Sequence, residues 1–366
     1  MRRGLVKILH VETGMHLYGG ALQVTYLVAG LAAQGVESLL VCPFGSAIAA
    51  EGYPESVSVF AMPMGGDLDL RFIWRLKRMI RRNHPDLLHL HSRRGADWLG
   101  GIGGSLAGVP IVLSRRVTNP EPPWLVPIKY RMFDRVVAIS RAIGDGLAEA
   151  GVPTSKIRVV HSAVPRPDPL IQRPREQLLS EFGLPADALV VGMAAQFIQR
   201  KGPEGLLEAI PKVLDRHPQA RFLLFGPGPL ADKMRSRADA RGLSQAVRFP
   251  GFRSDLTGYL GCLDLLVHPA LDEGLGIILL QAGAAGVPVV AASVGGVPEI
   301  IRDRVNGLLV PPGDAGDLAG AITRLLDARD LRIRLGRAGR EIVEREFSVE
   351  HMVRGNLEVY RELTRC

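Results

Sequence analysis

The sequence predicts an α/β protein of two domains, each a parallel sheet flanked by helices. Short aliphatic and β-branched runs, such as Val136-Val137-Ala138-Ile139 and Val190-Val191, alternate with longer amphipathic stretches along the chain. At 366 residues the chain is too long for one ordinary core, so two domains are expected. Its 42 glycines and 26 prolines separate apolar runs and form no low-complexity tract, which favours a compact fold.

A proline-rich segment marks the expected domain boundary. The pattern of the first domain continues to about Val160, and Pro165-Arg166-Pro167-Asp168-Pro169 then predicts a stiff, polar linker. We therefore expect a first domain over residues 1–165 and a second over residues 166–347.

The most informative segment is residues 265–301. Leu265–Val267 predicts a buried parallel strand, and Asp272-Glu273-Gly274-Leu275-Gly276 a loop before a helix expected from about Ile277 to Ala285. The glycines let the backbone approach a ligand, and the first N–H groups of the helix lack intrahelical partners. A phosphate or a sugar hydroxyl suits these donors, and Glu273 can accept hydrogen bonds from a sugar ring. The segment therefore predicts a sugar-nucleotide site.

These residues resemble family 4 of the retaining glycosyltransferases, the glycosyl transferases group 1. The resemblance implies the GT-B fold: two facing Rossmann-like domains with parallel sheets and an interdomain cleft. The family motif E-G-F-G-x-x-x-x-E is matched by Glu273, Gly274 and Gly276, and Gln281 stands at the second glutamate. The next two family motifs are also present, as Gly286-Val287-Pro288-Val289-Val290 and Gly295-Gly296-Val297-Pro298-Glu299. The resemblance implies a catalytic role for Glu273 and donor contacts by Gly274, Leu275, Gly276, Ile277 and Gln281.

The resemblance extends over nearly the whole chain. Lys7-Ile8-Leu9-His10-Val11 resembles the first strand of the family, and Gly19-Gly20-Ala21 resembles the glycine loop that approaches the donor phosphates. Gln199-Arg200-Lys201-Gly202 resembles the segment that supplies a phosphate-binding lysine. The resemblance thus implies donor contacts for Gly19, Gly20 and Lys201, and a last helix, within residues 348–366, that returns to the first domain.

His89-Leu90-His91-Ser92 resembles the H-x-H segment of the family, whose second histidine contacts the donor hexose. The resemblance therefore implies a catalytic role for His91. We expect His89 to point to the opposite face or to align differently near the end of the strand, and we interpret His268 as structural.

Two donor-side positions depart from the family pattern. The family's arginine, five residues before the lysine, is Gln196 here, and an amide does not replace a cation. Arg200 either supplies the missing charge or is a solvated loop residue. Gln281 can still accept a hydrogen bond from a ribose hydroxyl, at a cost of about 1–2 kcal/mol in lost charge-assisted bonds.

The function implied by the resemblance is retaining, metal-independent transfer of a sugar from a nucleotide-diphosphate donor to a glycan or glycolipid acceptor. The departing phosphate itself would take the acceptor proton, so no cofactor and no metal is expected. Assembly of bacterial envelope polysaccharide or lipopolysaccharide is the expected setting. Two alternatives remain: a catalytically silent nucleotide-sugar-binding subunit, suggested by Gln196 and Gln281, and a sugar-nucleotide epimerase of the same architecture.

The positive charge lies almost entirely in the first half. Residues 1–165 carry 19 Lys and Arg against 12 Asp and Glu, whereas residues 166–366 carry 26 against 25. Despite the pI near 9.7, nucleic-acid binding is not expected, because the basic residues are not interleaved with stacking aromatics.

Much of the charge in the first half falls in one predicted helix, residues 71–82, which has no acidic residue. Its apolar side chains gather on one side and its basic ones, with Trp74, on the other. Either this helix packs on the sheet with a solvated basic face, or it docks on an anionic membrane. The membrane-facing residues would be Arg71, Trp74, Arg75, Arg78 and Arg82. The preceding Asp67-Leu68-Asp69 has a metal-binding D-x-D pattern, but we expect a surface loop.

Three further residues are candidates for acceptor binding. Arg115, Arg116 and Trp124 lie in the first domain, where the family binds acceptors. Alternatively, the prolines before Trp124 serve only the loop itself.

The cysteines and hydropathy bear on location. Cys42, Cys262 and Cys366 have neither metal nor redox spacing, which indicates a reducing compartment. No uncharged apolar run of about 18 residues is present, so no transmembrane helix is expected, and Lys7 interrupts the only candidate signal sequence. We expect a cytoplasmic protein, with peripheral attachment to the membrane as the extension of the basic-helix hypothesis.

Overall fold

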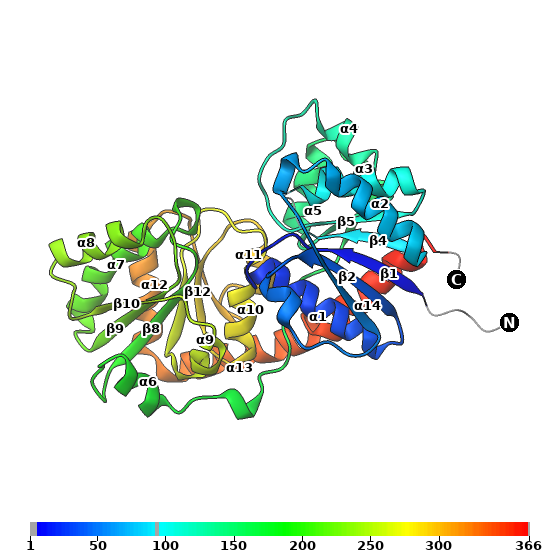
Figure 1. The fold of residues 1–366 in the computed structure, drawn as a ribbon. Coiled ribbons are helices and arrows are strands. Elements are labelled where there is room, and N and C mark those ends of the chain that lie inside the picture. Colours follow the sequence, from blue (N-terminus) through cyan, green and yellow to red (C-terminus); the bar gives the residue numbers. More distant parts are fainter. Residues whose placement is uncertain (1–5, 92–94, 365–366) are drawn as a thin grey trace. The chain divides into compact units, whose positions relative to one another are not determined.

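The computed structural model describes residues 6–91 and 95–364, so Ser92 and Cys366 lie outside the described residues. The chain divides into two compact units (Figure 1). The N-terminal unit comprises Met1–Pro165 and Ser348–Cys366, and the C-terminal unit comprises Arg166–Phe347.

A seven-stranded parallel sheet forms the centre of the N-terminal unit, in the order β3-β2-β1-β4-β5-β6-β7. The strands are Lys7–Val11 (β1), Glu37–Pro43 (β2), Val57–Met62 (β3), Leu87–Leu90 (β4), Ile111–Arg115 (β5), Arg135–Ala138 (β6) and Ile157–Val159 (β7). The strand order reverses direction between β1 and β4, which pair with Ile8 opposite Leu87. Ligands of such sheets bind beyond the carboxyl ends of the strands at this switch point. The segments that follow Val11 and Leu90 are therefore where a site is expected.

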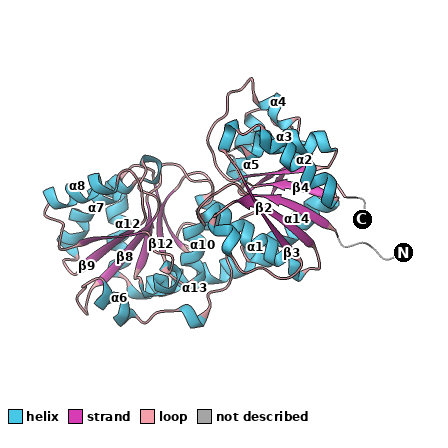
Figure 2. Cartoon of the chain, viewed as in Figure 1, coloured by secondary structure: helices cyan, strands magenta, loops and turns pink. Residues whose placement is uncertain are grey.

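Helices cover both faces of this sheet. They are Gly19–Ala33 (α1), Arg71–Asn83 (α2), Ala96–Ala107 (α3), Val126–Tyr130 (α4), Arg141–Glu149 (α5) and Val349–Arg361 (α14), with short 3₁₀ turns at Ala47–Ala50, Gly66–Leu68 and Thr154–Lys156. In Figure 2, α1 and α14 lie on one side of the sheet, and α2, α3 and α5 on the other.

The last helix, α14, packs in the N-terminal unit. Ser348 caps it by accepting a hydrogen bond from the backbone N–H of His351 at 3.3 Å. Its buried side chains, among them Val353 and Tyr360, share a core with Ile8 of β1 and Leu27 of α1. Burial of an aliphatic side chain contributes about 1.5–3 kcal/mol, so this apolar face holds α14 against the sheet.

The predicted basic helix is confirmed as α2. Its apolar side is the one that packs, since Phe72, Leu76 and Ile80 are buried. Trp74 lies on the other side with 63% of its surface exposed. The preceding Asp67-Leu68-Asp69 segment forms the end of a 3₁₀ turn, as expected of a surface loop.

The C-terminal unit has a six-stranded parallel sheet in the order β10-β9-β8-β11-β12-β13. The strands are Leu189–Ala194 (β8), Ala220–Phe225 (β9), Val247–Gly251 (β10), Leu265–His268 (β11), Val289–Ala292 (β12) and Gly307–Val310 (β13). Here the switch point lies between β8 and β11, with Val191 opposite Leu265. The segments after Ala194 and His268 therefore meet at one edge of the sheet.

The helices of this unit are Arg175–Glu181 (α6), Pro203–Arg216 (α7), Ala231–Ala240 (α8), Leu256–Tyr259 (α9), Ile277–Ala284 (α10), Val297–Ile300 (α11), Ala315–Asp327 (α12) and Arg329–Glu346 (α13), with 3₁₀ turns at Pro169–Ile171, Gln199–Lys201 and Leu260–Cys262. Apolar side chains of α7 and α12, such as Leu206, Ile210 and Ile322, are buried with strand residues in one core. This core fixes the strand ends from which the functional loops start.

In the described part of the chain, no helix combines the length and the apolar character needed to cross a membrane.

Candidate active site

A buried carboxylate marks the switch point of the C-terminal unit. Glu273 follows β11 and is 8% exposed. Its carboxylate accepts a hydrogen bond from Nε2 of His268 at 2.9 Å and one from the backbone N–H of Gly274 at 3.1 Å. It also forms an ion pair with the ammonium group of Lys201. Burial alone would raise the pKa of Glu273, but the His268 hydrogen bond and the Lys201 charge outweigh it and hold the pKa well below its usual value. Glu273 is therefore ionised at neutral pH.

Lys201 comes from the segment after β8. It ends the 3₁₀ turn Gln199–Lys201, and the carbonyl of Arg200 accepts a hydrogen bond from the N–H of Leu271 at 2.8 Å. Gly202 follows with a φ of +63°, and a Cβ there would lie 2.0 Å from the carbonyl oxygen of Pro269. Only glycine fits this approach, which docks the lysine segment on the loop that carries Glu273.

A second glycine supports the same loop from β12. Gly295 has a φ of +48°, and a Cβ there would lie 2.0 Å from the carbonyl oxygen of Glu273. The N–H of Gly296 donates a hydrogen bond to that carbonyl at 3.2 Å. The Gly295-Gly296 pair therefore fixes the backbone of Glu273, while Lys201 and His268 fix its side chain.

The switch point of the N-terminal unit carries three buried histidines. His10 is the next-to-last residue of β1, His89 lies in β4 and His91 directly follows β4, and each is at most 2% exposed. Nδ1 of His10 lies 3.0 Å from Nε2 of His91. His89 is held by the hydroxyls of Tyr360, at 2.6 Å from Nδ1, and of Ser114, at 2.8 Å from Nε2.

The expectation that His89 points to the opposite face from His91 is wrong. The centroids of the two rings lie 3.9 Å apart. Side chains alternate along a strand with a period of two, so residues two positions apart share a face. Burial lowers the pKa of all three histidines, to about 3 for His10, and they are neutral at pH 7.

Arg116 sets the direction of the protons in this cluster. One of its terminal nitrogens lies 3.5 Å from Nδ1 of His91. A guanidinium only donates, so Nδ1 of His91 accepts and Nε2 of His91 carries the proton that it donates to His10. His10 then bears its proton on Nε2, which is buried without a hydrogen-bond partner among the described residues.

Arg116 also lies beside the start of α1. A Cβ at Gly20 would lie 3.7 Å from Cδ of Arg116. Burial lowers the pKa of Arg116 to about 10, while the neighbouring Glu12 acts to raise it, and the guanidinium remains charged at pH 7. The backbone N–H groups at the start of a helix and a cation together favour a negatively charged ligand.

The same histidines satisfy the spacing of a metal site. In the described residues, His10, His89 and His91 each offer a ring nitrogen, and these atoms lie within 4.8 Å of one another. Both nitrogens of His89 are already hydrogen-bonded, and the charged Arg116 adjoins His91. These contacts disfavour a divalent cation, because binding one through His89 would break one of its two hydrogen bonds and place the cation beside a guanidinium.

Two family models together match most of the chain. Residues 18–166 match the model described as Glycosyltransferase Family 4, and residues 174–342 match the model described as Glycosyl transferases group 1. The lipopolysaccharide core biosynthesis glycosyltransferase LpsE of Rhizobium meliloti is 30% identical over 277 residues, covering 75% of this chain and 76% of LpsE. The chain belongs to the family 4 glycosyltransferases. It is therefore an enzyme, a glycosyltransferase of the hexosyltransferase type.

Other relatives and solved structures agree with this. A D-inositol 3-phosphate glycosyltransferase of Nocardioides sp. is 32% identical over 317 residues, covering 76% of this chain and 67% of that protein. The crystal structure of a glycosyltransferase from Rickettsia africae ESF-5 covers 98% of this chain and 99% of its own, with a TM-score of 0.86 at 22% identity. That of Anabaena Alr3699/HepE with UDP and glucose covers 97% and 99%, with a TM-score of 0.83 at 22% identity. These likenesses show that the fold is GT-B.

The structure brings several predicted site residues of this glycosyltransferase into contact. Lys201, Glu273 and Gly274 meet in the C-terminal unit. Leu275 is buried, Gly276 caps α10 with a φ of +96°, Ile277 is its first residue, and Gln281 is half-buried on the same helix. In the N-terminal unit, His91 and Gly20 both adjoin Arg116, and Gly19 begins α1.

Other predicted residues stand apart. Gln196 is exposed, and the side chain of Arg200 makes no hydrogen bond or ion pair in the described structure. Arg115 is 4% exposed and lies 3.6 Å from Glu121, so it belongs to the interior. Trp124 is 69% exposed on the loop between β5 and α4.

The sequence interpretation missed three side chains that hold the site residues. His268, which we expect from the sequence to be structural, binds Glu273 directly. Neither His10 nor Tyr360 is among the site residues predicted from the sequence, although His10 contacts His91 and Tyr360 contacts His89. For His10 and His268 a signal existed, because His268 ends its strand and His10 lies one residue before the end of its strand, each at a switch point. None existed for Tyr360, which is 271 residues away from its partner.

Proposed function

We propose that this enzyme transfers a hexose from a nucleotide-diphosphate sugar to a glycan or glycolipid acceptor, with retention of configuration and without a metal ion. The observation that carries the proposal is the buried, ionised Glu273 held between Lys201 and His268 at the carboxyl end of β11. The solved structures of Alr3699/HepE with UDP and UDP-glucose support a nucleotide-sugar donor.

Lys201 is suited to stabilise the leaving diphosphate. An ammonium group has three N–H donors, so Lys201 can keep its bond to Glu273 and still donate to a phosphate oxygen. Its side chain is 13% exposed, which leaves part of it accessible. Arg200 adds a second positive charge next to it in sequence, and the N–H groups at the start of α10 add donors. These cations support a metal-independent mechanism, because they supply the positive charge that a metal would otherwise provide.

Glu273 and Gln281 are suited to bind the two sugars of the donor. In the proposed role, Glu273 accepts hydrogen bonds from hydroxyls of the hexose, and Gln281 accepts one from the ribose. Lys201 and His268 both bind Oε2 of Glu273, so the carboxylate is held in one orientation. The lone pairs that remain available to a sugar therefore have a fixed direction. No enzymic nucleophile is required in the proposed reaction. The bond between the anomeric carbon and the phosphate oxygen breaks, and the acceptor oxygen bonds to that carbon from the same face, which gives retention. The departing phosphate oxygen takes the proton of the acceptor hydroxyl.

Lipopolysaccharide or polysaccharide assembly is the proposed setting. LpsE and LpsD of Rhizobium meliloti are lipopolysaccharide core biosynthesis glycosyltransferases, and LpsD is 27% identical over 287 residues. We also propose that the enzyme acts in the cytoplasm and associates peripherally with anionic membranes through the basic face of α2. Arg71, Trp74, Arg78 and Arg82 on this face are exposed. Arg75 differs, because it is paired with Asp69.

A thermal-shift screen against UDP-, GDP-, ADP- and TDP-sugars tests the donor assignment. Stabilisation by one nucleotide class, lost in Lys201→Ala and kept in the surface control Lys233→Ala, is the expected result. Release of the nucleoside diphosphate should then rise when a glycan or glycolipid acceptor is added. Binding without such release would favour the catalytically silent subunit, and no binding of any nucleotide sugar would overturn the proposal.

A further inference from the structure

Large apolar side chains are exposed at the start of α2. Leu68 is 91% exposed, Leu70 66% and Trp74 63%. A single exposed leucine is ordinary on a protein surface, but here three large apolar side chains are exposed within seven residues. Lys77 lies over the Trp74 ring, with its ammonium 5.1 Å from the ring centroid. We call Leu68, Leu70 and Trp74 the apolar tip.

The turn that carries the apolar tip is braced. Asp69 accepts a hydrogen bond from the N–H of Gly65 at 2.9 Å and is ion-paired with Arg75. Arg75 also donates to the carbonyl of Pro63 at 2.8 Å. The Gly65 hydrogen bond and the Arg75 charge lower the pKa of Asp69, so the pair stays ionised. Two leucines flank this anchored aspartate and are held out in solvent.

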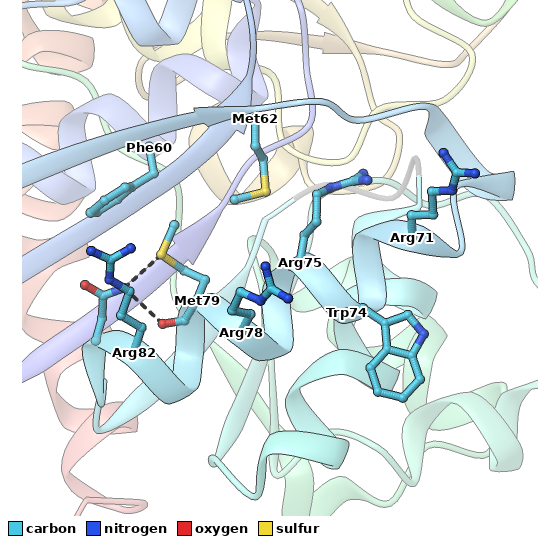
Figure 3. A pocket seen from close by; sticks show the side chains of 9 residues that line it. Phe60, Met62, Arg71, Trp74, Arg75, Arg78, Met79 and Arg82 are labelled. Atoms are coloured by element: carbon cyan, nitrogen blue, oxygen red, sulfur yellow. Dashed lines mark hydrogen bonds between the residues drawn. The ribbon is translucent and has the colours of Figure 1, made fainter.

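A basic hollow lies between β3 and α2, and Trp74 of the apolar tip is among the residues that line it (Figure 3). It has a volume of about 640 Å³, and its apolar wall is formed by Phe60, Met62 and Met79. Figure 3 shows the arginines of α2 around this wall, while the indole of Trp74 points away from Phe60 and Met62. The arginines that line it are Arg71, Arg75, Arg78 and Arg82.

The arginines of the hollow are not equivalent. Arg75 is committed to Asp69 and Pro63. The exposed side chains of Arg71, Arg78 and Arg82 make no hydrogen bond or ion pair among the described residues. A guanidinium matches the geometry of a phosphate, and an apolar wall matches the glycerol and acyl carbons attached to it.

We propose that the hollow binds the phosphate of an anionic phospholipid in a bilayer, while the apolar tip inserts among the neighbouring lipids. The proposal deepens the membrane association proposed above and rests on it, but it assigns the binding to particular residues. A nucleic acid carries the same phosphate charge, but Leu68 and Leu70 cannot stack on its bases. A bound nucleic acid would therefore leave these exposed leucines without contacts. A lipid surface uses both the charges and the apolar tip.

Vesicle flotation tests the apolar tip. Wild type, Leu68→Ser/Leu70→Ser and the control Leu170→Ser, whose leucine is 93% exposed in the other unit, are mixed with phosphatidylcholine vesicles with and without phosphatidylglycerol. We expect binding only with phosphatidylglycerol, about tenfold weaker for the double variant and unchanged for the control. Binding by the double variant equal to that of wild type would overturn insertion of the tip.

Charge reversal tests the hollow. Arg78→Glu/Arg82→Glu should bind the same vesicles at least tenfold more weakly, whereas Arg334→Glu, an exposed arginine of α13, should not differ from wild type. Unchanged binding would overturn the phosphate site. Release of nucleoside diphosphate in solution without vesicles should be the same in all these variants, so loss of vesicle binding with intact turnover separates this proposal from the glycosyltransferase function. If wild type released nucleotide but bound no vesicle, the membrane proposal alone would fall.

Discussion

The two switch points of this enzyme bury polar groups in opposite electrostatic states. In the C-terminal unit, Glu273 is ionised because Lys201 and His268 compensate its burial. In the N-terminal unit, His10, His89 and His91 are neutral because burial dominates, and for His89 and His91 the charge of Arg116 further disfavours protonation. Burial alone therefore does not decide the charge of a site. The neighbours decide it: Glu273 with Lys201 and His268 forms a charged site, and the three histidines form a neutral, hydrogen-bonding cluster.

The largest expected effect comes from removing Lys201, the cation of the charged site around Glu273. Lys201→Ala leaves Glu273 buried without its ion-pair partner, which costs about 3–5 kcal/mol for a buried pair. Turnover should fall at least 100-fold and donor-induced stabilisation should disappear, as measured by nucleotide release and thermal shift. Lys233→Ala, at an exposed ion pair, is the control. Wild-type turnover in Lys201→Ala would show that the charged site around Glu273 is only structural.

Replacing Glu273 by a neutral residue tests its charge, because it changes how stability depends on pH. The folded-state pKa of Glu273 is depressed, so its stabilising effect is present above the unfolded value near 4.5 and is lost as the pH falls below it. Glu273→Gln keeps the shape but does not titrate. Its melting temperature should fall less steeply than that of wild type below pH 5, and its turnover should drop about tenfold or more. Parallel melting curves for the two proteins in acid would contradict an ionised Glu273.

The neutral histidine cluster of the N-terminal unit predicts a loss of stability in acid that begins at a higher pH than the loss due to Glu273. Because the folded-state pKa of His10 is lowered to about 3, stability is complete above the unfolded value near 6.5 and is lost as the pH falls through 6 and 5. Each such histidine contributes up to about 1.4 kcal/mol per pH unit. His10→Gln, which can hydrogen-bond but does not titrate in this range, should reduce the slope of unfolding free energy between pH 6.5 and 5. An unchanged slope would mean that His10 is protonated in the folded protein.

The smallest expected effect concerns the contact from α14. Tyr360→Phe removes the hydroxyl that binds Nδ1 of His89 and leaves that nitrogen buried without its partner. Denaturant unfolding should show a loss of about 1–3 kcal/mol. Tyr26→Phe, a half-buried tyrosine whose hydroxyl makes no hydrogen bond among the described residues, should differ little from wild type. Equal losses in the two variants would show that the Tyr360 hydrogen bond has no special weight.

The sequence by itself determined the fold class and the segments that carry Glu273 and Lys201. Alternating apolar runs predict parallel sheets because only a strand buried on both faces is apolar throughout. The glycines around Glu273 and beside Lys201 indicate close backbone approach because glycine alone tolerates it, and both are local in sequence. The helix α2 was predictable for the same reason, since its amphipathic pattern is written in consecutive residues.

Only the tertiary structure decided which side chains meet. His89 and Tyr360 are 271 positions apart, and Lys201 and Glu273 are 72 apart, so no local pattern records these contacts. Arg75 and Arg78 look alike in the helical pattern, yet Asp69 binds only the first. The sequence alone also does not predict the protonation state of the histidines, because a pKa depends on burial and on charges brought together by folding. Sequence sets which groups are present and where the chain bends, and the packing of distant segments sets their charge.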